Sequence, residues 1–495
     1  MKLVNGISGD RQARPRSAQP LPLCVDLDGT LVKTDLLHEA AITFATRQPW
    51  SAWRLVQWAA QGASTLKQRL SEQIAIDPAC LPYRDDLIEH MLSHRAQQGS
   101  VHLITASPQR WANAVAHHLG FFDSVIASTA EINLKGSVKA EALVRQFGPG
   151  GFLYVGDSLH DAPVWAVADT AFGAGPRALR YLPKGSKIFA STDAPSLAML
   201  HALRPHQWLK NLLVFVPLLT SHGIANPEML LSALAAFVAF CCCASSAYLT
   251  NDIIDLNADR IHPRKRLRPF ASGSLPLWAG IALAPLLLLC AALFCLATTS
   301  AFAILLAGYY LLTQAYSLTL KRRAPADVFT LAGLYTIRVI AGAAAIGVPL
   351  SLWLAAFSIF TFLGLAVLKR QAELVDAVAR DVDIAPGRGY RTADGPTLVP
   401  MGIASGFCSV LVLTLYVAQP HVAVMYRTPA LLWLIAPPLL YWITRMWLLA
   451  QRRQMHDDPI VFAMRDAVSR NIIGLCLSIG AIATFVELPL PLQLH

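Results

Sequence analysis

The second half of the chain is dominated by long apolar stretches, whereas the first half is not. Between residues 208 and 490 these stretches run for about 17–25 residues, the length that an α-helix needs to cross a lipid bilayer. Nine candidate spans result, at residues 209–225, 230–250, 276–298, 301–319, 328–347, 350–368, 398–418, 430–449 and 471–488. The pattern therefore predicts an all-α transmembrane domain of nine helices.

In residues 21–200 short apolar runs alternate with helical patterns. Residues 21–25, 101–105 and 152–155 are strand-like, and each run ends in polar residues. This alternation is typical of an α/β, Rossmann-like domain with a parallel sheet, in which functional groups gather at the carboxyl ends of the strands. Residues 45–95, with three tryptophans and a helical pattern, indicate a helical cap inserted into this domain.

The start of the chain and its composition bound the remaining possibilities. Residues 1–20 are polar and contain arginines, without the apolar core of a signal peptide, so we expect a disordered tail there. The α/β domain would then span residues 21–200 and the membrane domain residues 201–495. A hydrophobic fraction of 55% with 15% charged residues exceeds that of ordinary soluble domains. The nine cysteines show no metal-ligand or disulfide spacing, so we expect small apolar side chains.

Basic residues concentrate in alternate loops between the apolar spans. They lie in the loops 251–275, 320–326, 369–397 and 450–470, whereas the intervening loops contain Arg427 alone. Because cytoplasmic loops collect lysine and arginine, we expect a multi-pass protein of the bacterial inner membrane with these loops in the cytoplasm. Nine spans then place the N-terminal domain in the cytoplasm and the C-terminus outside. The net charge of +10 comes largely from these loops. Because the basic residues lie between apolar spans and not on one soluble face, we expect no nucleic-acid partner.

Two carboxylates stand at the end of the first strand-like run. Asp26 and Asp28 are two residues apart, so in a strand they lie on the same side of the chain. One can attack a phosphorus atom while the other acts as general acid and base. Further polar residues follow in order at or after the later runs: Thr105, Lys139, Asp157 and Asp161. This pattern predicts a phosphate-handling site at the edge of the sheet.

The ordered set over residues 21–175 resembles the four motifs of the haloacid dehalogenase (HAD) superfamily. The resemblance implies that Asp26 forms an aspartyl-phosphate and that Asp28 is the general acid and base. It also implies that Thr105 and Lys139 bind the phosphoryl group that is transferred.

The same resemblance implies a Mg²⁺ site, in which Asp157, with Asp161 close by, holds the ion together with Asp26. Two other interpretations stay open. The acids could be ordinary turn residues at strand ends, since Asp-Gly is a common turn pair. The domain could also be a HAD fold that has lost activity and only regulates.

An acidic motif follows the second apolar span, next to the membrane. Asn251, Asp255 and Asp259 are spaced four residues apart, and Asp252 shares their face of a helix. Acids beside a bilayer are costly unless they bind cations, and Mg²⁺ with a diphosphate meets that need. Basic residues that could bind phosphate oxygens follow directly: Arg264, Lys265, Arg266 and Arg268. The alternative is a solvated interfacial face.

This acidic motif resembles the first motif of the UbiA superfamily of membrane prenyltransferases, whose nine-helix plan covers residues 204–490 here. The resemblance implies that Asp252, Asp255 and Asp259 bind Mg²⁺ and that the first two act in catalysis. It also makes Asn251 a substrate ligand.

The second acid-rich motif of that superfamily is reduced here. The corresponding stretch runs from Tyr316 to Lys321 and then offers Asp327 alone, which disfavours a standard aromatic prenyltransferase. Four other segments resemble the decaprenyl-phosphate phosphoribosyltransferase branch: residues 204–211, 369–374, 387–390 and 457–463. That branch moves 5-phosphoribose from phosphoribosyl diphosphate to a polyprenyl phosphate.

A phosphate acceptor needs cations near the mouth of its site. Candidates for this role are Lys210, Lys321 and Lys369, and further substrate-binding candidates are Tyr316, Asp327 and Arg388. Arg338 lies inside the fifth span, where a charge is functional by default, although a snorkelling or helix-pairing arginine is the alternative. For residues 457–459 the alternative is a helix cap with an early proline.

Together these observations predict a bifunctional membrane enzyme. The membrane half would make a polyprenyl-phosphoryl 5-phosphoribose, and the HAD half would remove its 5-phosphate. One alternative is an aromatic polyprenyltransferase of quinone biosynthesis with a regulatory or unrelated HAD phosphatase. Another is a transferase whose HAD domain only binds or regulates. The sequence leaves the prenyl chain length and the oligomeric state open.

Overall fold

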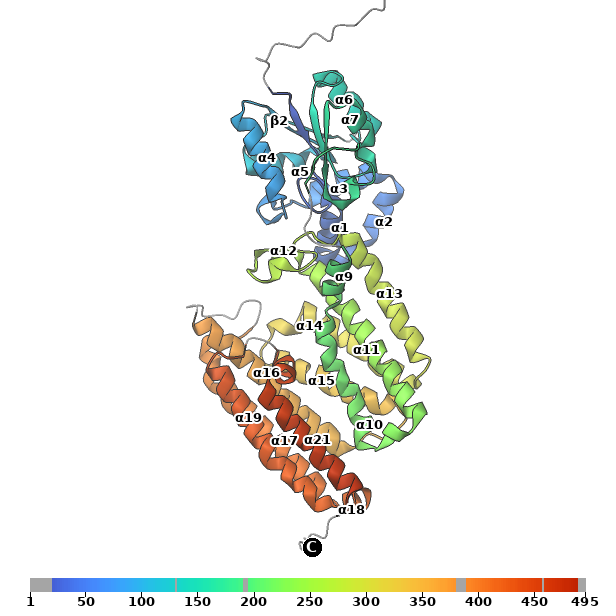
Figure 1. Ribbon diagram of the computed structural model, residues 1–495, viewed down its shortest axis with the longest axis vertical. Coiled ribbons are helices and arrows are strands. Elements are labelled where there is room, and N and C mark those ends of the chain that lie inside the picture. The colour runs from blue at the N-terminus through green and yellow to red at the C-terminus, as the bar shows by residue number, and fades with distance from the viewer. Residues whose placement is uncertain (1–19, 130, 190–194, 380–388, 456–457, 488–495) are drawn as a thin grey trace, which may run out of the picture. The chain divides into compact units, whose positions relative to one another are not determined.

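The computed structural model describes residues 20–129, 131–189, 195–379, 389–455 and 458–487, so the expected tail lies almost wholly outside it. The chain divides into two compact units (Figure 1). The first comprises Met1–Met199 together with Asp252–Gly280, and the second comprises Leu200–Asn251 together with Ile281–His495. Residues 252–280 therefore group with the N-terminal half, although they lie between two long apolar helices.

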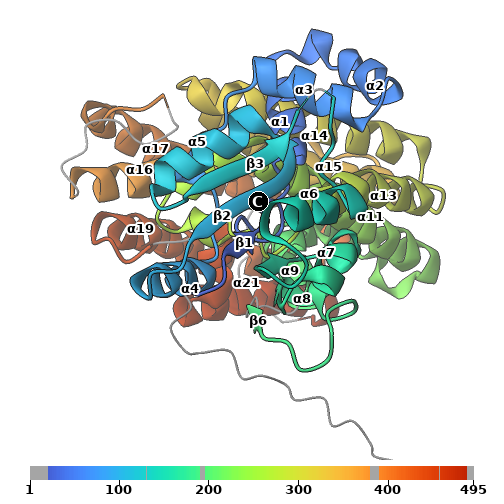
Figure 2. The ribbon, with the colours of Figure 1, turned by 90° about the horizontal axis from the view of Figure 1, so that it is seen from above.

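A six-stranded parallel sheet forms the centre of the first unit, in the order β3-β2-β1-β4-β5-β6, which confirms the predicted α/β fold. The strands are β1 (Leu23–Val25), β2 (Val101–Pro108), β3 (Ser124–Ser128), β4 (Leu153–Gly156), β5 (Thr170–Ala174) and β6 (Ile188–Phe189). Figure 2 shows β1, β2 and β3 side by side. Strand order reverses between β1 and β4, the place where ligands bind in such sheets.

Helices connect and cover these strands. They are α4 (Asp85–Ala96), α5 (Gln109–Leu119), α6 (Ser137–Phe147), α7 (Ala162–Val167) and α8 (Gly175–Ala178), and α9 (Pro195–Leu203) comes after the last strand. The glycine at the end of α5, Gly120, has a left-handed backbone that terminates the helix.

The helical insertion after β1 packs on the sheet without a separate core. It consists of α1 (Leu36–Arg47), η1 (Pro49–Ser51), α2 (Trp53–Ala60), α3 (Ala63–Gln73) and η2 (Pro78–Cys80). Phe44, Trp58 and Leu70 belong to the same buried cluster as Leu23 and Val25 of β1. The insertion is therefore held against the strand that carries the first acidic motif.

Eight helices in the described part of the chain are long and apolar enough to cross a membrane. They are α11 (Pro227–Ile254), α13 (Leu277–Cys295), α14 (Ser300–Leu318), α15 (Ala326–Ala345), α16 (Leu352–Val378), α17 (Gly395–Val417) with η8 (Thr392–Asp394), α19 (Ala436–Gln451) with η9 (Pro429–Ile435), and α21 (Ala467–Phe485). Shorter helices are α12 (Leu256–Ile261), η6 (Lys265–Leu267), η7 (Leu320–Arg322), α18 (Pro420–Met425) and α20 (Pro459–Arg465). Each of the eight long helices overlaps one of the nine predicted spans.

The first predicted span, residues 209–225, folds differently. It begins within a 3₁₀ helix, η4 (Pro205–Phe215), continues as the short α10 (Val216–Thr220) and ends in η5 (Gly223–Ala225). Pro217 stands in the first turn of α10, where it lacks the amide hydrogen that a continuous helix needs. The segment is therefore apolar enough for a span but is divided into short pieces.

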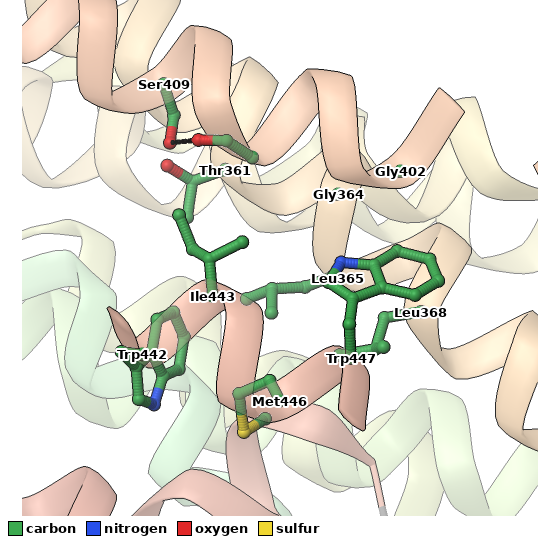
Figure 3. A pocket seen from close by; sticks show the side chains of 11 residues that line it. Thr361, Gly364, Leu365, Leu368, Gly402, Ser409, Trp442, Ile443, Met446 and Trp447 are labelled. Atoms are coloured by element: carbon green, nitrogen blue, oxygen red, sulfur yellow. Dashed lines mark hydrogen bonds between the residues drawn. The ribbon is translucent and has the colours of Figure 1, made fainter. Parts of the chain in front are cut away.

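Helices α16 and α17 approach each other closely through glycines. A β-carbon added at Gly364 would lie 3.1 Å from the carbonyl oxygen of Gly402, and one at Gly402 would meet the Trp447 ring at 2.3 Å. A small cavity of about 20 Å³ remains among α16, α17 and α19 (Figure 3). Its walls are apolar apart from hydroxyl groups such as those of Thr361 and Ser409. We interpret it as a packing cavity, because no charged group lines it.

Candidate active sites

The candidate hydrolase site lies where β1, β2 and β4 end. Asp26 directly follows β1, Thr105 lies within β2, and Asp157 directly follows β4. Because β1 pairs with both β2 and β4, the ends of these strands meet at one edge of the sheet. Asp161 closes η3 (Leu159–Asp161), and Lys139 comes from the first turns of α6. The sheet thus gathers residues that are far apart in the sequence.

Lys139 binds two of the acids. Its Nζ lies 2.9 Å from Asp26 Oδ1 and 3.3 Å from Asp161 Oδ1, and its side chain is only 4% exposed. Burial alone would lower the pKa of Lys139, but the two carboxylates raise it above its ordinary value. The lysine is therefore charged and neutralises part of the acidic cluster.

Asp26, Asp157 and Asp161 each offer a carboxylate oxygen within 4.8 Å of the others, the only such group of three among the described residues. Burial raises the pKa of Asp26 to about 8 and that of Asp157 to about 6. Oxygen donors of this kind suit Mg²⁺. Gly29 leaves room for the cluster, since its φ is +75° and a β-carbon there would lie 2.3 Å from Asp157 Oδ2. The donor set fits a divalent cation.

Asp161 holds the loop that carries this cluster. Burial would raise the pKa of Asp161, but Lys139 and a hydrogen bond from Tyr154 hold it below its ordinary value. The Tyr154 hydroxyl donates to Asp161 Oδ1 at 2.6 Å, and the amide of Asp157 donates to Asp161 Oδ2 at 3.1 Å. Tyr154 was not among the predicted site residues, and its position two residues before Gly156 on β4 is the signal that could have identified it.

Asp28 is not part of this cluster, and two hydrogen-bond donors hold its carboxylate. Its Oδ1 accepts from the amide of Leu36 at 2.9 Å, and its Oδ2 accepts from the Ser107 hydroxyl at 2.6 Å. Burial, with Asp35 nearby, raises the pKa of Asp28 to about 6. Thr105 is buried and accepts from the amide of Ser107, a second residue that the sequence analysis did not select. Asp28 can thus exchange a proton near neutral pH.

The membrane-side acidic motif also folds into an ion-paired group, but a different one. The single helix expected for residues 251–259 is interrupted at Asp255, between α11 and α12. Asp252 and Asp259 are buried and share Arg268, whose Nη1 lies 3.0 Å from Asp252 Oδ1 and 2.5 Å from Asp259 Oδ2. Asp255 lies half-buried at the break, and Asn251 precedes it on α11.

In the described part of the chain, the predicted Mg²⁺ ligands Asp252, Asp255 and Asp259 do not form a second group of three close carboxylates. Arg268 supplies the positive charge between the two buried acids. Lys265, at 3.9 Å from Asp259, adds a second cation, and Arg266 is exposed on η6. Lys265, Arg266 and Arg268 were all predicted to bind phosphate oxygens, whereas the structure pairs Arg268 with the two buried acids of the motif.

The second unit contains a cluster centred on Asp458. Lys210 of η4 and Lys369 of α16 each donate to Asp458 Oδ2 at 2.9 Å. The Tyr335 hydroxyl donates to the same carboxylate at 3.0 Å. Burial would raise the pKa of Asp458, but the two lysines hold it well below its ordinary range. Asp458 also caps α20 through the amide of Ile460, so the helix-cap interpretation of residues 457–459 describes part of its role.

Arg338 lies in the interior beside this cluster. It is 5% exposed, and its guanidinium donates to Asn211 Oδ1 at 3.0 Å and to the Tyr309 hydroxyl at 2.7 Å. It also bonds to the carbonyl of Leu334 and stacks over the Tyr309 ring. Arg338 therefore links η4, α14 and α15 and does not snorkel toward an interface.

A third polar cluster surrounds Arg370 of α16. Its Nε lies 2.5 Å from Asp327 Oδ2, and it also pairs with Glu373. The Tyr316 hydroxyl donates to Asp327 Oδ1 at 2.8 Å. The structure thus brings together Tyr316 and Asp327, two of the predicted substrate ligands, around a buried arginine. Lys321 lies half-buried in η7, whereas Arg388 falls outside the described residues.

Comparison with known proteins accounts for both halves. The family model described as haloacid dehalogenase-like hydrolase matches residues 68–165, and that of the UbiA prenyltransferase family matches residues 212–467, more than half of the chain. This chain belongs to the UbiA prenyltransferase family. The UbiA part is fused to a HAD domain, as expected from the motifs.

Two relatives are similar to this UbiA-family chain over different lengths. It is 36% identical over 468 residues to the uncharacterized protein y4nM of Sinorhizobium fredii, covering 92% of this chain and 90% of that protein. It is 39% identical over 180 residues to the decaprenyl-phosphate phosphoribosyltransferase of Mycolicibacterium smegmatis, covering 36% of this chain and 57% of that protein. The fusion is thus shared along nearly the whole length with the first relative.

Among solved structures, a UbiA homolog from Archaeoglobus fulgidus bound to GPP and Mg²⁺ covers 57% of this chain and 99% of that one, with a TM-score of 0.45 at 14% identity. Family membership and eight apolar helices make this chain a multi-pass membrane protein. Its two domains indicate a transferase joined to a hydrolase.

Proposed function

We propose that this UbiA-family protein transfers 5-phosphoribose from phosphoribosyl diphosphate to a polyprenyl phosphate, and that its HAD domain then removes the 5-phosphate. The observation that carries the transfer is the 39% identity to a decaprenyl-phosphate phosphoribosyltransferase. The product of that transfer is a phosphomonoester, which is a suitable substrate for a hydrolase that forms an aspartyl-phosphate. We assign residues 21–200 to the hydrolase domain and residues 201–495 to the transferase domain.

In the transfer step, an oxygen of the lipid phosphate bonds to the anomeric carbon of the ribose, and the bond from that carbon to the diphosphate breaks. The diphosphate leaves with the electron pair of that bond. Asp252, Asp255 and Asp259 would hold Mg²⁺, which when bound neutralises charge on the diphosphate. Asn251 would contact the same group, and basic residues would bind its outer oxygens: Lys265, Arg266 and Arg268.

The lipid phosphate needs its own cations. Lys210 and Lys369 are suited to this role, because both already bind one carboxylate oxygen of Asp458. We propose that Asp458 keeps the two ammonium groups converged and that the phosphate then shares them. Further substrate contacts are assigned to Tyr316, Lys321, Asp327 and Arg388.

In the hydrolysis step, a carboxylate oxygen of Asp26 bonds to phosphorus, and the bond from phosphorus to the 5′-oxygen breaks. Asp28 gives its proton to that oxygen and then accepts one from the water that attacks the aspartyl-phosphate. Water thereby releases inorganic phosphate and restores Asp26. Lys139 and Thr105 would bind the phosphoryl oxygens. Asp26, Asp157 and Asp161 would hold Mg²⁺, which when bound screens the negative charge of the phosphoryl group from the attacking carboxylate.

The distribution of basic loops supports the bacterial inner membrane as the location, with the HAD domain in the cytoplasm. Reporter fusions test this orientation. A cytoplasmic reporter should be active after residue 270, and a periplasmic reporter should be active after His495. A cytoplasmic C-terminus would mean that residues 209–225, which fold as short helices, do not cross the bilayer.

Purified protein with radiolabelled phosphoribosyl diphosphate and polyprenyl phosphate tests the reaction. Wild type should make a lipid-soluble label, and mass spectrometry should show that the lipid product lacks the 5-phosphate. The Asp26→Asn variant should make the same amount of lipid product with the phosphate retained. Labelling of an aromatic acceptor from a prenyl diphosphate, without lipid labelling, would favour the quinone-type alternative. Equal dephosphorylation by wild type and variant would show that the HAD domain has another substrate.

A further inference from the structure

Arg260 of α12 makes a buried ion pair that neither candidate site explains. Its two terminal nitrogens donate to the two carboxylate oxygens of Glu39 on α1, at 2.9 and 2.6 Å. Its Nε donates to the carbonyl of Ala271 at 3.2 Å. The side chain of Arg260 is 5% exposed and that of Glu39 is 8% exposed. The pair therefore joins the loop after α11 to the hydrolase domain within the first compact unit.

Because both side chains are buried, each charge of this pair requires the other. A carboxylate and a guanidinium lose their hydration when they are buried, so the fold tolerates them only when they satisfy each other. The two parallel hydrogen bonds fix both distance and orientation. Glu39 also accepts from the Thr34 hydroxyl, so its position is set from two sides. Removing either partner would leave an uncompensated buried charge.

A second contact lies beside the ion pair. Gly273 has a φ of +75°, and a β-carbon there would lie 2.6 Å from Lys33 Cβ and 3.5 Å from Pro82 Cγ. Helix α12 also contacts η2 of the helical insertion. The surface formed by residues 256–274 is therefore in close contact with residues 33–39 and with residues 78–82 of the hydrolase domain.

This surface is near both acidic motifs in the chain. Arg260 directly follows Asp259, which pairs with Arg268. On the hydrolase side, the carbonyl of Thr34 accepts from the amide of Gly29 at 3.2 Å. The amide of Leu36 donates to Asp28 at 2.9 Å. The segment that contacts residues 256–274 is thus the one that positions the acid and base of the hydrolase.

We propose that residues 256–274 are a docking surface for the hydrolase domain of the same chain, anchored by the Arg260–Glu39 pair. The inference rests on the proposed function: docking keeps the hydrolase site beside the acidic motif of the transferase, so the phosphorylated lipid is processed before it diffuses away. Arg260 and Glu39 are positioning residues in this scheme. Holding two sites together raises the effective concentration of one site's product at the other.

Charge reversal in the full-length protein tests this docking. Arg260→Glu and Glu39→Arg should each raise the ratio of phosphorylated to dephosphorylated lipid by about tenfold, because the intermediate escapes. The double variant should restore the wild-type ratio. Total lipid labelling should stay at the wild-type rate, which shows that the transferase domain folds. Hydrolysis of p-nitrophenyl phosphate is measured in each variant, so that lipid ratios are compared at equal hydrolase activity. Arg69→Glu breaks an exposed pair with Glu72 on α3 and is the matched control, with no expected change.

Hydrogen exchange separates failure of the docking from failure of the proposed function. In both single variants the amides of residues 33–39 and 256–274 should lose protection, and the double variant should regain it, whatever the substrate. Unchanged protection in the single variants would overturn the docking surface. Wild-type lipid ratios in the single variants, or no restoration in the double variant, would overturn its role in processing. A wild type that labels no lipid would refute the proposed function, with the exchange result still deciding the docking.

Discussion

The two acidic motifs of this chain reach similar burial by different routes. In the hydrolase domain, Asp26 follows β1 whereas Asp157 and Asp161 follow β4, and Lys139 from α6 pairs with Asp26 and Asp161. In the motif after α11, Asp252 and Asp259 come from one short stretch and share Arg268. The first group keeps three carboxylates within reach of one cation, whereas the second has an arginine between its two buried acids.

The hydrolase cluster has excess negative charge that a cation could neutralise. In the motif after α11, an arginine already neutralises part of the charge. The hydrolase cluster carries three acids against one lysine, and burial raises the pKa of Asp26 to about 8. A divalent ion would relieve that excess. In the membrane-side motif Arg268 already compensates part of the charge, so a diphosphate and its metal would have to share or displace it.

The largest effect is expected at Asp26, the proposed nucleophile of the hydrolase. Asp26→Asn replaces a charged oxygen by a neutral amide of the same shape, so hydrolysis of p-nitrophenyl phosphate should fall by at least about 10⁴-fold. Lipid labelling should continue, since the transferase site uses other residues. Asp169→Asn, at an exposed acid of the same domain, is the control and should be fully active. Retained hydrolysis in Asp26→Asn would remove this aspartate from the site.

The next largest effect is expected at the membrane-side motif. Asp252→Ala or Asp255→Ala removes a proposed Mg²⁺ ligand, and lipid labelling from phosphoribosyl diphosphate should fall by at least about 100-fold. The same variants should hydrolyse small phosphomonoesters normally. Glu228→Gln changes an exposed acid in the first turn of α11 and serves as the control. Full transferase activity in both alanine variants would show that the diphosphate binds elsewhere.

A smaller effect is expected for Arg268. Arg268→Gln leaves Asp252 and Asp259 without their shared partner, and stability should fall by about 2 kcal/mol in a Mg²⁺-free buffer. Added Mg²⁺ should recover most of this loss, because the ion can replace the missing charge. Thermal unfolding with and without Mg²⁺ measures both quantities. Lys265→Gln, which removes a cation 3.9 Å from Asp259, should change little. A loss that Mg²⁺ does not recover would mean that the motif is a structural ion pair.

The smallest effect is a pH dependence of the hydrolase. The pKa of Asp28 is raised to about 6, so its protonated form prevails below that pH and is lost as pH rises. As the general acid it must be protonated. At saturating Mg²⁺, which would keep Asp26 ionised, kcat/KM for ribose 5-phosphate should decline by about tenfold per pH unit above 6. p-Nitrophenyl phosphate has a leaving group that needs little protonation, so its profile should lack this decline. Identical profiles for both substrates would assign the proton transfer to another group.

The sequence predicted the elements of both halves well, because local patterns determine them. Apolar runs of bilayer length predicted eight helices that are present in the described part of the chain. The alternation of strand-like and helical patterns before residue 200 predicted the parallel sheet. The span predicted at residues 209–225 was divided by Pro217 and by 3₁₀ geometry, which hydrophobicity alone does not register. The motif residues near strand ends converged because parallel strands begin and end together.

The tertiary structure alone decided which charges pair. Tyr154 and Ser107 are ordinary polar residues in sequence, and only packing places them beside candidate site residues. Arg268 and Asp458 lie in segments that the sequence singled out, but their partners were not predicted. The same holds for Arg260 and Glu39, which are separated by 221 positions. The physical reason is that hydrophobic periodicity specifies which face of an element is buried, whereas the partner of a buried charge depends on which elements meet. The sequence therefore determined the two domains and their chemical groups, and the fold determined how those groups neutralise one another.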